Sequence, residues 1–272
     1  MSNWITANEA ALIEQAASLI TATAYRAVAE RGRFTLVLSG GKTPKRVYEK
    51  LARGVHEGLL RQFGCTLPVH ARRSAHDREA VTLPWPETFL FQGDERYVPT
   101  SHPDSNFRMV RETIMRHACI RRDNLFRMPV ESGDPEADAL RYESLLRGVF
   151  RRGGTGTSTG FPDFDLVMLG LGRDGHTASL FPGDGRALNE RERWVIAVNA
   201  PLAEPPGIRL TLTLPVINHA KTVMFLVPSE RSELARSIHE GKRPDLPAGM
   251  VIPIHGQPRW FVADPEQEIV HP

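Results

Sequence analysis

A glycine-rich segment places an acidic and a basic side chain close together. Residues 165–183 read DLVMLGLGRDGHTASLFPG, so an apolar run typical of a buried strand leads directly into the glycines that flank Asp174 and His176. Glycine allows sharp turns that present a neighbouring side chain, and an imidazole with a pKa near 6.5 exchanges protons at neutral pH. An aspartate two residues away can orient that imidazole. The segment therefore predicts a general base, His176, supported by Asp174.

The same segment also spells the G-x-G-x-x-G pattern of dinucleotide-binding proteins. A pyrophosphate-binding turn opens a long helix, but Pro182 leaves room for only about two helical turns after His176. The acidic residue that would bind a ribose is also missing, because the next strand-like run ends at Asn199. Both differences favour a catalytic turn over a nucleotide-binding one.

A second glycine loop has the character of an anion site. The apolar run 34–38 is followed by SGGKTP at residues 39–44, after which a helical pattern begins. Backbone N–H groups at glycines and at a helix N-terminus attract anions, and hydroxyl and ammonium groups add further donors. The spacing is not that of a Walker loop. The sequence predicts a phosphate cradle here, with a plain tight turn as the alternative.

Charged side chains follow two further strand-like runs. Asp94 and Arg96 lie two residues apart after the run 88–92 and can therefore point the same way, whereas Glu95 is interpreted as part of a solvated turn or of a helix-cap network. Arg209 lies at the start of another strand-like run, in which apolar and polar residues alternate. Its guanidinium suits phosphate, although a single arginine at such a place more often forms a surface ion pair.

The composition indicates an ordinary globular protein. Of 272 residues, 41% are hydrophobic, and 34 basic against 32 acidic side chains leave a net charge of +2, so no nucleic-acid partner is expected. The two cysteines are too few for a disulfide framework or a zinc site. No signal pattern and no run of 18 apolar residues is found, which predicts a cytoplasmic protein without a membrane partner. A monomer or a small homo-oligomer is expected.

Helical patterns and short apolar runs alternate along the chain. A first helix is expected over residues 6–30, with Thr6 and Glu9 in capping-box spacing and Gly32 at its end. Strands are expected at 34–38, 88–91, 124–128, 164–169, 194–198, 222–227 and 260–263. This alternation predicts one α/β domain over residues 1–272, with a mainly parallel, Rossmann-like sheet covered by helices on both faces. Residues 65–86 and 151–160 lack apolar periodicity and are predicted to be loop insertions.

Four segments, taken together and in order, resemble the 6-phosphogluconolactonases of the pentose phosphate pathway, within the glucosamine-6-phosphate isomerase/6-phosphogluconolactonase family. They are residues 39–44, 93–106, 165–183 and 209–218, and the resemblance covers nearly the whole chain. It implies a three-layer α/β sandwich and an enzyme that hydrolyses 6-phospho-D-glucono-1,5-lactone. A phosphorylated sugar lactone is then the small-molecule partner, and neither a cofactor nor a metal is needed.

The resemblance also assigns the phosphate-binding residues. The 6-phosphate would be held by the cradle residues Ser39, Gly40, Gly41, Lys42 and Thr43. Arg209 would be their cationic partner. Arg231 stands in the segment where the family usually has a lysine, and it would supply a positive charge with a different reach.

For catalysis, the resemblance implies that His176 takes a proton from the attacking water and that Asp174 orients the imidazole. Arg96 would stabilise the oxyanion or bind sugar, and Asp94 would bond sugar hydroxyls. The family's deaminases have a glutamate where this chain has Phe181, which cannot move a proton. The lactonase is therefore favoured over the alternatives, a hexosamine-phosphate deaminase or isomerase and a sugar-phosphate-binding regulator without activity.

Overall fold

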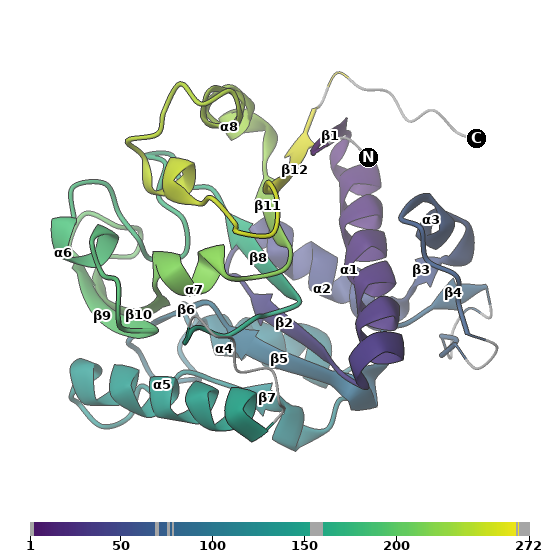
Figure 1. Cartoon of the computed structure of the whole chain (residues 1–272), viewed down its shortest axis with the longest axis horizontal. Helices are drawn as coiled ribbons and strands as arrows, with labels where there is room; N and C mark the ends of the chain where they lie inside the picture. Colours follow the sequence, from purple (N-terminus) through teal and green to yellow (C-terminus); the bar gives the residue numbers. More distant parts are fainter. Residues whose placement is uncertain are drawn as a thin grey trace.

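A parallel sheet forms the centre of the molecule (Figure 1). The computed structural model describes residues 3–68, 71–74, 77, 79–152, 160–264 and 266, and within them the central sheet has seven strands in the order β1-β12-β11-β8-β2-β5-β7, with every neighbouring pair parallel. These strands are β1 (Trp4–Ala7), β2 (Phe34–Leu38), β5 (Thr88–Gln92), β7 (Leu125–Phe126), β8 (Leu166–Gly170), β11 (Val223–Val227) and β12 (Arg259–Ala263). The predicted mainly parallel sheet is confirmed.

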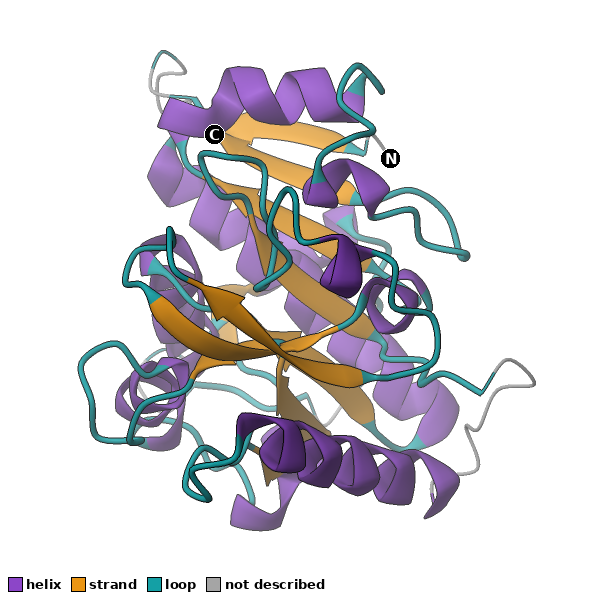
Figure 2. Cartoon of the chain, turned by 90° about the vertical axis from the view of Figure 1, so that its left-hand side faces the viewer, coloured by secondary structure: helices purple, strands orange, loops and turns teal. Residues whose placement is uncertain are grey.

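Helices cover both faces of this sheet, which gives the expected three layers (Figure 2). One face carries α1 (Glu9–Arg31), α2 (Lys42–Arg53), α3 (Glu57–Gln62) and α4 (Asn106–Val110), which continues as a π-helical turn, Arg111–Met115. The other face carries α5 (Pro135–Arg152), α6 (Gly185–Leu188), α7 (Leu214–Asn218) and α8 (Ser232–His239). Short 3-10 turns lie at Trp85–Glu87, Arg122–Asn124, Ser229–Arg231 and Pro247–Met250. None of the described helices combines the length and the apolar character that a membrane crossing requires.

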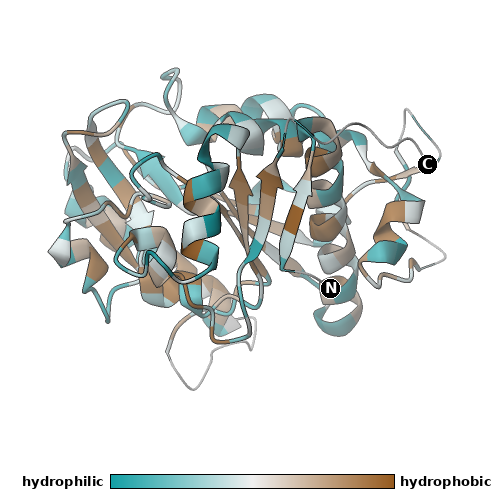
Figure 3. Ribbon diagram, turned by 90° about the horizontal axis from the view of Figure 1, so that it is seen from above, coloured by the Kyte–Doolittle hydropathy of each residue, from teal (hydrophilic) through white to brown (hydrophobic). Residues whose placement is uncertain are grey.

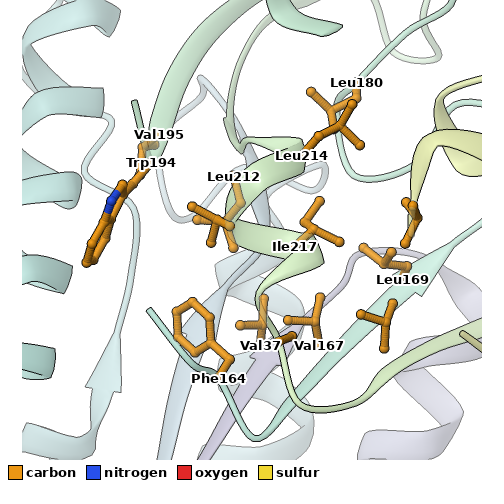
Figure 4. Close-up of a cluster of buried hydrophobic side chains, with 14 of the residues drawn as sticks. Val37, Phe164, Val167, Leu169, Leu180, Trp194, Val195, Leu212, Leu214 and Ile217 are labelled. Atoms are coloured by element: carbon orange, nitrogen blue, oxygen red, sulfur yellow. The ribbon is translucent and has the colours of Figure 1, made fainter. Parts of the chain in front are cut away.

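Alternation of side chains along the central strands divides the interior into two cores. In β8, Val167 and Leu169 belong to the core beneath α5 and α7, whereas Leu166 and Met168 belong to the core beneath α1 and α2. Figure 4 shows Val167 and Leu169 in the first of these clusters. Because both faces are covered, the strands are mainly apolar on both sides, and brown residues predominate in several central strands of Figure 3.

A smaller antiparallel sheet lies beside the central one. It consists of β6 (Asp94–Arg96), β10 (Gly207–Leu212) and β9 (Val195–Ala200), with β10 in the middle. The run 194–198 was expected in the parallel sheet, and that expectation is wrong: residues 201–206 are too few for a parallel crossover, so β9 and β10 pair as an antiparallel hairpin. The register places Arg209 opposite Arg96.

One glycine joins the two sheets. The N–H of Gly93 donates to the carbonyl of Leu38 at the end of β2 (2.9 Å), and its carbonyl accepts from the N–H of Leu212 at the end of β10 (2.8 Å). A Cβ at this position would lie 3.1 Å from the Leu38 oxygen. The chain thus passes from the central sheet to the smaller one through a residue with little room for a side chain.

The first helix begins later than its sequence pattern predicted. The proposed capping box is wrong, because Thr6 belongs to β1 and the side chain of Asn8 caps the helix by accepting a hydrogen bond from the N–H of Ala11 (3.0 Å). The pairing of β1 with β12 decides this boundary, and that contact spans nearly the whole chain. Gly32 ends the helix in the left-handed conformation (φ 71°), as predicted.

The two predicted insertions are only partly described. Within residues 65–86, β4 (Ala80–Val81) pairs with β3 (Val55–His56), and Val81 and Leu83 are fully buried in the core that contains α1, so this part is not a plain surface loop. Residues 151 and 152 complete α5. The rest of the predicted insertion at 151–160, up to residue 159, and residues 69, 70, 75, 76 and 78 lie outside the described residues.

Candidate active site

A cavity of about 870 Å³ lies where loops leave the carboxyl ends of β2, β8 and β11. Its lining includes every site residue predicted from the sequence: Ser39, Gly40, Gly41, Lys42, Thr43, Asp94, Arg96, Asp174, His176, Arg209 and Arg231. In a parallel sheet the carboxyl ends of neighbouring strands meet at one edge, which brings together segments far apart in sequence. The structure therefore gathers the predicted residues in one place.

His176 and Asp174 form a close pair at this cavity. The imidazole Nδ1 lies 2.5 Å from Asp174 Oδ1, and the same oxygen accepts a hydrogen bond from the His176 N–H at 3.1 Å. Burial raises the pKa of the Asp174 carboxyl, but the main-chain amide and the imidazole of His176 outweigh it and hold that pKa below its usual value. An ionised Asp174 fixes a proton on Nδ1, which leaves Nε2 as the nitrogen that can accept one.

The turn that carries this pair needs its glycines. A Cβ on Gly172 would lie 2.1 Å from His176 Nδ1, and Gly175 has a φ of 82°. After the turn the chain forms a narrow bridge between Thr177 and Leu180, and the next described helix, α6, has only four residues. No long helix follows whose N-terminus could receive a pyrophosphate, which agrees with the preference for a catalytic turn.

The cradle after β2 exposes the start of a helix to the cavity. Gly41 precedes α2 with a φ of 113°, and no side chain caps the helix there. The hydroxyl of the fully buried Tyr48 holds the cradle in place, because it accepts from the N–H of Ser39 (2.8 Å) and donates to the Ser39 carbonyl (2.7 Å). Burial raises the pKa of Tyr48, so this hydroxyl keeps its proton. The 12-residue helix therefore offers backbone donors to an anion.

Arg96, Arg209 and Arg231 share one arrangement in the cavity wall. In each, a terminal nitrogen is anchored to a main-chain carbonyl, at distances of 2.7, 2.5 and 2.9 Å respectively. The carbonyls belong to Asp104, Pro205 and Leu171. In all three the Nε is buried and has no hydrogen-bond partner among the described residues.

Buried cationic donors without partners are costly, so this cluster favours an anionic ligand. Arg209 is only 4% exposed, and burial, with a smaller contribution from the nearby Arg96, lowers its pKa from the usual value. An anion placed between these arginines and the N-terminus of α2 would compensate the charge. Among the described residues, no group of three or more His, Cys, Asp and Glu side chains is placed to hold a metal ion.

Comparison with known proteins identifies the family. Residues 7–260 match the family described as glucosamine-6-phosphate isomerases/6-phosphogluconolactonase. The chain belongs to this family. Two members similar to it are the 6-phosphogluconolactonases of a Synechocystis species (41% identical) and a Nostoc species (35% identical), each over 81% of this chain and 77% of the relative. The crystal structure of the Thermotoga maritima 6-phosphogluconolactonase matches with a TM-score of 0.75 and 27% identity, over 96% of this chain and 99% of that one.

Phe181 is the residue by which the sequence separated the two activities of this family. Its ring centroid lies 4.7 Å from that of His176, and the guanidinium carbon of Arg209 lies 5.9 Å from the centre of the same ring. An apolar ring thus lies between the imidazole and an arginine, where it packs against both. The side chain beside the candidate base has no group that could exchange a proton.

Asp94 and Glu95 both accept hydrogen bonds from protein groups. Both oxygens of Asp94 already bind protein groups, Ser179 Oγ at 2.7 Å and Asn106 Nδ2 at 3.2 Å, so the carboxylate organises the cavity wall whether or not it also meets a sugar. Glu95 is 1% exposed and accepts from the amides that begin α4. Of its two interpretations, the helix-cap network is confirmed and the solvated turn is wrong.

Sequence reasoning missed several residues of this family member's cavity. Asn106 and Arg173 line it, and Ser179 supports it from a fully buried position. Asn106 lies in one of the segments that carried the family resemblance. Nothing in that segment predicted that the Asn106 side chain would contact both Arg96 and the backbone of the cradle at Gly40. Arg173 directly precedes Asp174, but its charge alone did not indicate that it would line the cavity.

Proposed function

We propose that this chain hydrolyses 6-phospho-D-glucono-1,5-lactone to 6-phospho-D-gluconate. The observation that carries the proposal is the imidazole of His176, oriented by Asp174, in the same cavity as three arginines whose buried Nε atoms have no partner. Such a site combines a base with a place for an anion, which is what a phosphorylated ester substrate requires. The curated relatives named above carry the same activity in their names.

In this mechanism the cradle and Arg209 hold the 6-phosphate. The backbone donors at the start of α2 and a guanidinium suit the acceptor oxygens and the negative charge of a phosphate group. Arg231, from the 3-10 turn after β11, adds positive charge to the same cavity. Binding energy from the phosphate then fixes the distant lactone carbonyl against the base.

His176 acts on water at the other end of the substrate. Its Nε2 takes a proton as the water oxygen bonds to C1, and the carbonyl oxygen becomes an oxyanion that Arg96 stabilises. When the intermediate collapses, the bond between C1 and the ring oxygen breaks, and His176 returns its proton to that oxygen. One water is consumed and one ester bond is lost, and the single product carries a carboxylic acid, which ionises, and a new hydroxyl group.

The site supports deaminase or isomerase chemistry less well. Opening and isomerising a sugar ring requires an additional acid or base, and the ring of Phe181 occupies the space beside the imidazole.

The assay adds purified protein to freshly generated lactone and follows release of 6-phosphogluconate above the spontaneous rate. Acceleration that His176→Ala removes is expected. Absence of acceleration would refute the proposed function and would favour a binding protein, and acceleration that His176→Ala retains would refute the assigned base.

A further inference from the structure

We propose that Asn106 is a positioning residue that fixes the guanidinium of Arg96 and joins it to the phosphate cradle. This inference rests on the proposed function, because it concerns how the oxyanion-stabilising group is held. Asn106 is the first residue of α4 and is 5% exposed. Its carboxamide lies at the point where three separate segments of the cavity wall meet.

The carboxamide of Asn106 makes three hydrogen bonds within the protein. Oδ1 accepts from Arg96 NH1 at 2.8 Å, while Nδ2 donates to the main-chain carbonyl and to the carboxylate of Asp94, at 3.0 and 3.2 Å. A carboxamide nitrogen has two protons, so both donors are used. The side chain therefore acts on its neighbours and leaves no donor for a substrate.

The same carboxamide packs against the cradle. A Cβ built on Gly40 would lie 2.2 Å from Asn106 Oδ1, so the cradle backbone approaches this side chain as closely as a glycine allows. The contact connects the loop after β2 with the segment that carries Asp94 and Arg96. A shift of the carboxamide would therefore disturb the spacing between the phosphate site and the arginine.

Glu95 fixes the backbone on both sides of this junction. One carboxylate oxygen accepts from the N–H of Asn106 (2.7 Å) and of Arg96 (2.8 Å), and the other accepts from the N–H of Phe107 (2.8 Å) and from Ser105 Oγ (3.1 Å). A single buried carboxylate thus ties the start of α4 to β6. This support keeps the Asn106 side chain from following the arginine if the arginine moves.

Asn106 provides one of two anchors that hold the guanidinium of Arg96. The Arg96 Nη1 donates to Asn106 Oδ1 and to the carbonyl of Asp104, while the Arg96 Nε is buried without a hydrogen-bond partner in the described part of the chain. Loss of the carboxamide leaves one anchor, and the guanidinium can then rotate. Because Arg96 acts on the oxyanion, the change should appear in kcat, while the phosphate contacts keep KM nearly constant.

The test compares Asn106→Ala with a matched control, Asn124→Ala. Asn124 is also buried, and its side chain donates to the carbonyl of Pro86 away from the cavity (2.9 Å). In the lactone assay we expect Asn106→Ala to lower kcat about tenfold to a hundredfold, with KM within about threefold of the wild type. Asn124→Ala should lower thermal stability and leave kcat unchanged.

A double-mutant cycle separates positioning from general support of the fold. If Asn106 acts through Arg96, then Asn106→Ala should cost less than about twofold in kcat in the Arg96→Ala background. Asn106→Asp has the same shape but places a second carboxylate where the amide now donates to Asp94 at 3.2 Å. Repulsion between the two carboxylates should move the side chain away from Arg96 and lower kcat, so this variant tests the inference if the alanine variant does not fold. Wild-type kcat in a folded Asn106→Ala or Asn106→Asp protein would overturn the inference, as would losses that multiply fully in the double mutant.

Failure of the proposed function looks different. A wild-type protein without lactonase activity refutes that function, and an Arg96→Ala variant with full activity refutes the role of Arg96 and this inference with it. If Arg96→Ala is impaired while both Asn106 variants are fully active, the proposed function stands and only the inference falls.

Discussion

Replacing Gly172 by alanine should remove most of the activity without unfolding the protein. The new Cβ would lie 2.1 Å from His176 Nδ1 and 2.2 Å from its Cε1. The ring therefore has to move by more than about 1 Å to reach ordinary van der Waals contact, which begins near 3.5 Å. That movement separates Nδ1 from the carboxylate of Asp174, now 2.5 Å away.

The expected size of the effect follows from this displacement. A misplacement of about 1 Å costs on the order of a hundredfold in rate, equivalent to about 2.7 kcal/mol of transition-state stabilisation. The backbone itself should tolerate the change, because Gly172 is not among the described glycines with positive φ. We therefore expect the free energy of unfolding to change by less than about 1 kcal/mol.

The assay measures kcat/KM on freshly generated lactone, corrected for spontaneous opening, and thermal unfolding by circular dichroism. Gly185→Ala is the matched control, since a Cβ there would meet only Asn189 Nδ2 at an ordinary 3.8 Å. The control should keep wild-type activity, and Gly172→Ala should fall toward the activity of His176→Ala. A folded Gly172→Ala protein with kcat/KM within about threefold of the wild type would refute the idea that this imidazole position is needed.

Three further changes test other parts of the structure. Asp174→Asn keeps the side-chain shape but removes the charge that orients His176, so kcat should fall by about two orders of magnitude; an unchanged kcat would mean that the pair has no catalytic role. Gly40→Ala puts a Cβ 2.2 Å from Asn106 Oδ1 and so displaces both that carboxamide and the cradle backbone: kcat should fall, as in Asn106→Ala, and KM for the lactone should also rise about tenfold. An unaltered KM would argue against the cradle as the phosphate site. Burial raises the pKa of Glu143, but bonds from arginines and from two amides at the start of β9 hold it below its usual 4.5. This stabilisation is present above the unfolded-state pKa and is lost as pH falls through the folded-state pKa, so Glu143→Gln should flatten the decline in unfolding free energy below about pH 4.5. Urea titrations at several pH values measure this, and an equally steep decline in the variant would contradict it.

The sequence was sufficient to predict which residues gather at the cavity. The runs that became β2 and β8 are mainly apolar without alternation, which is typical of strands covered on both faces, and parallel strands place the loops that follow them at one edge. The cradle at 39–43 and the pair of Asp174 and His176 were therefore expected at the same edge of the sheet. That they lie close together depends on the pairing of β2 with β8, which the sequence did not predict.

Contacts between segments that are distant in the chain could not be predicted from the sequence. Ser179 and Asp94 are 85 residues apart, and the bond between them depends on how β6 lies against the catalytic turn. The start of α1 was misplaced for the same reason, since local capping preferences favoured Thr6 while the partner strand β12 comes from the far end of the chain. The antiparallel pairing of β9 with β10 follows from the short connection at residues 201–206, and hydrophobic periodicity alone does not distinguish parallel from antiparallel pairing.

The single glycine between the two sheets has a consequence for how the cavity meets its ligand. Because Gly93 bonds to the end of β2 on one side and to the end of β10 on the other, the loop after β2 and the strand that carries Arg209 share one rigid junction. A hinge needs residues that can absorb changes of φ and ψ, and this residue is fixed by both of its backbone groups. We therefore expect the spacing of the two walls to be the same with and without a ligand. Little of the binding energy should then be spent on ordering the protein, and a ligand of the wrong length should bind weakly.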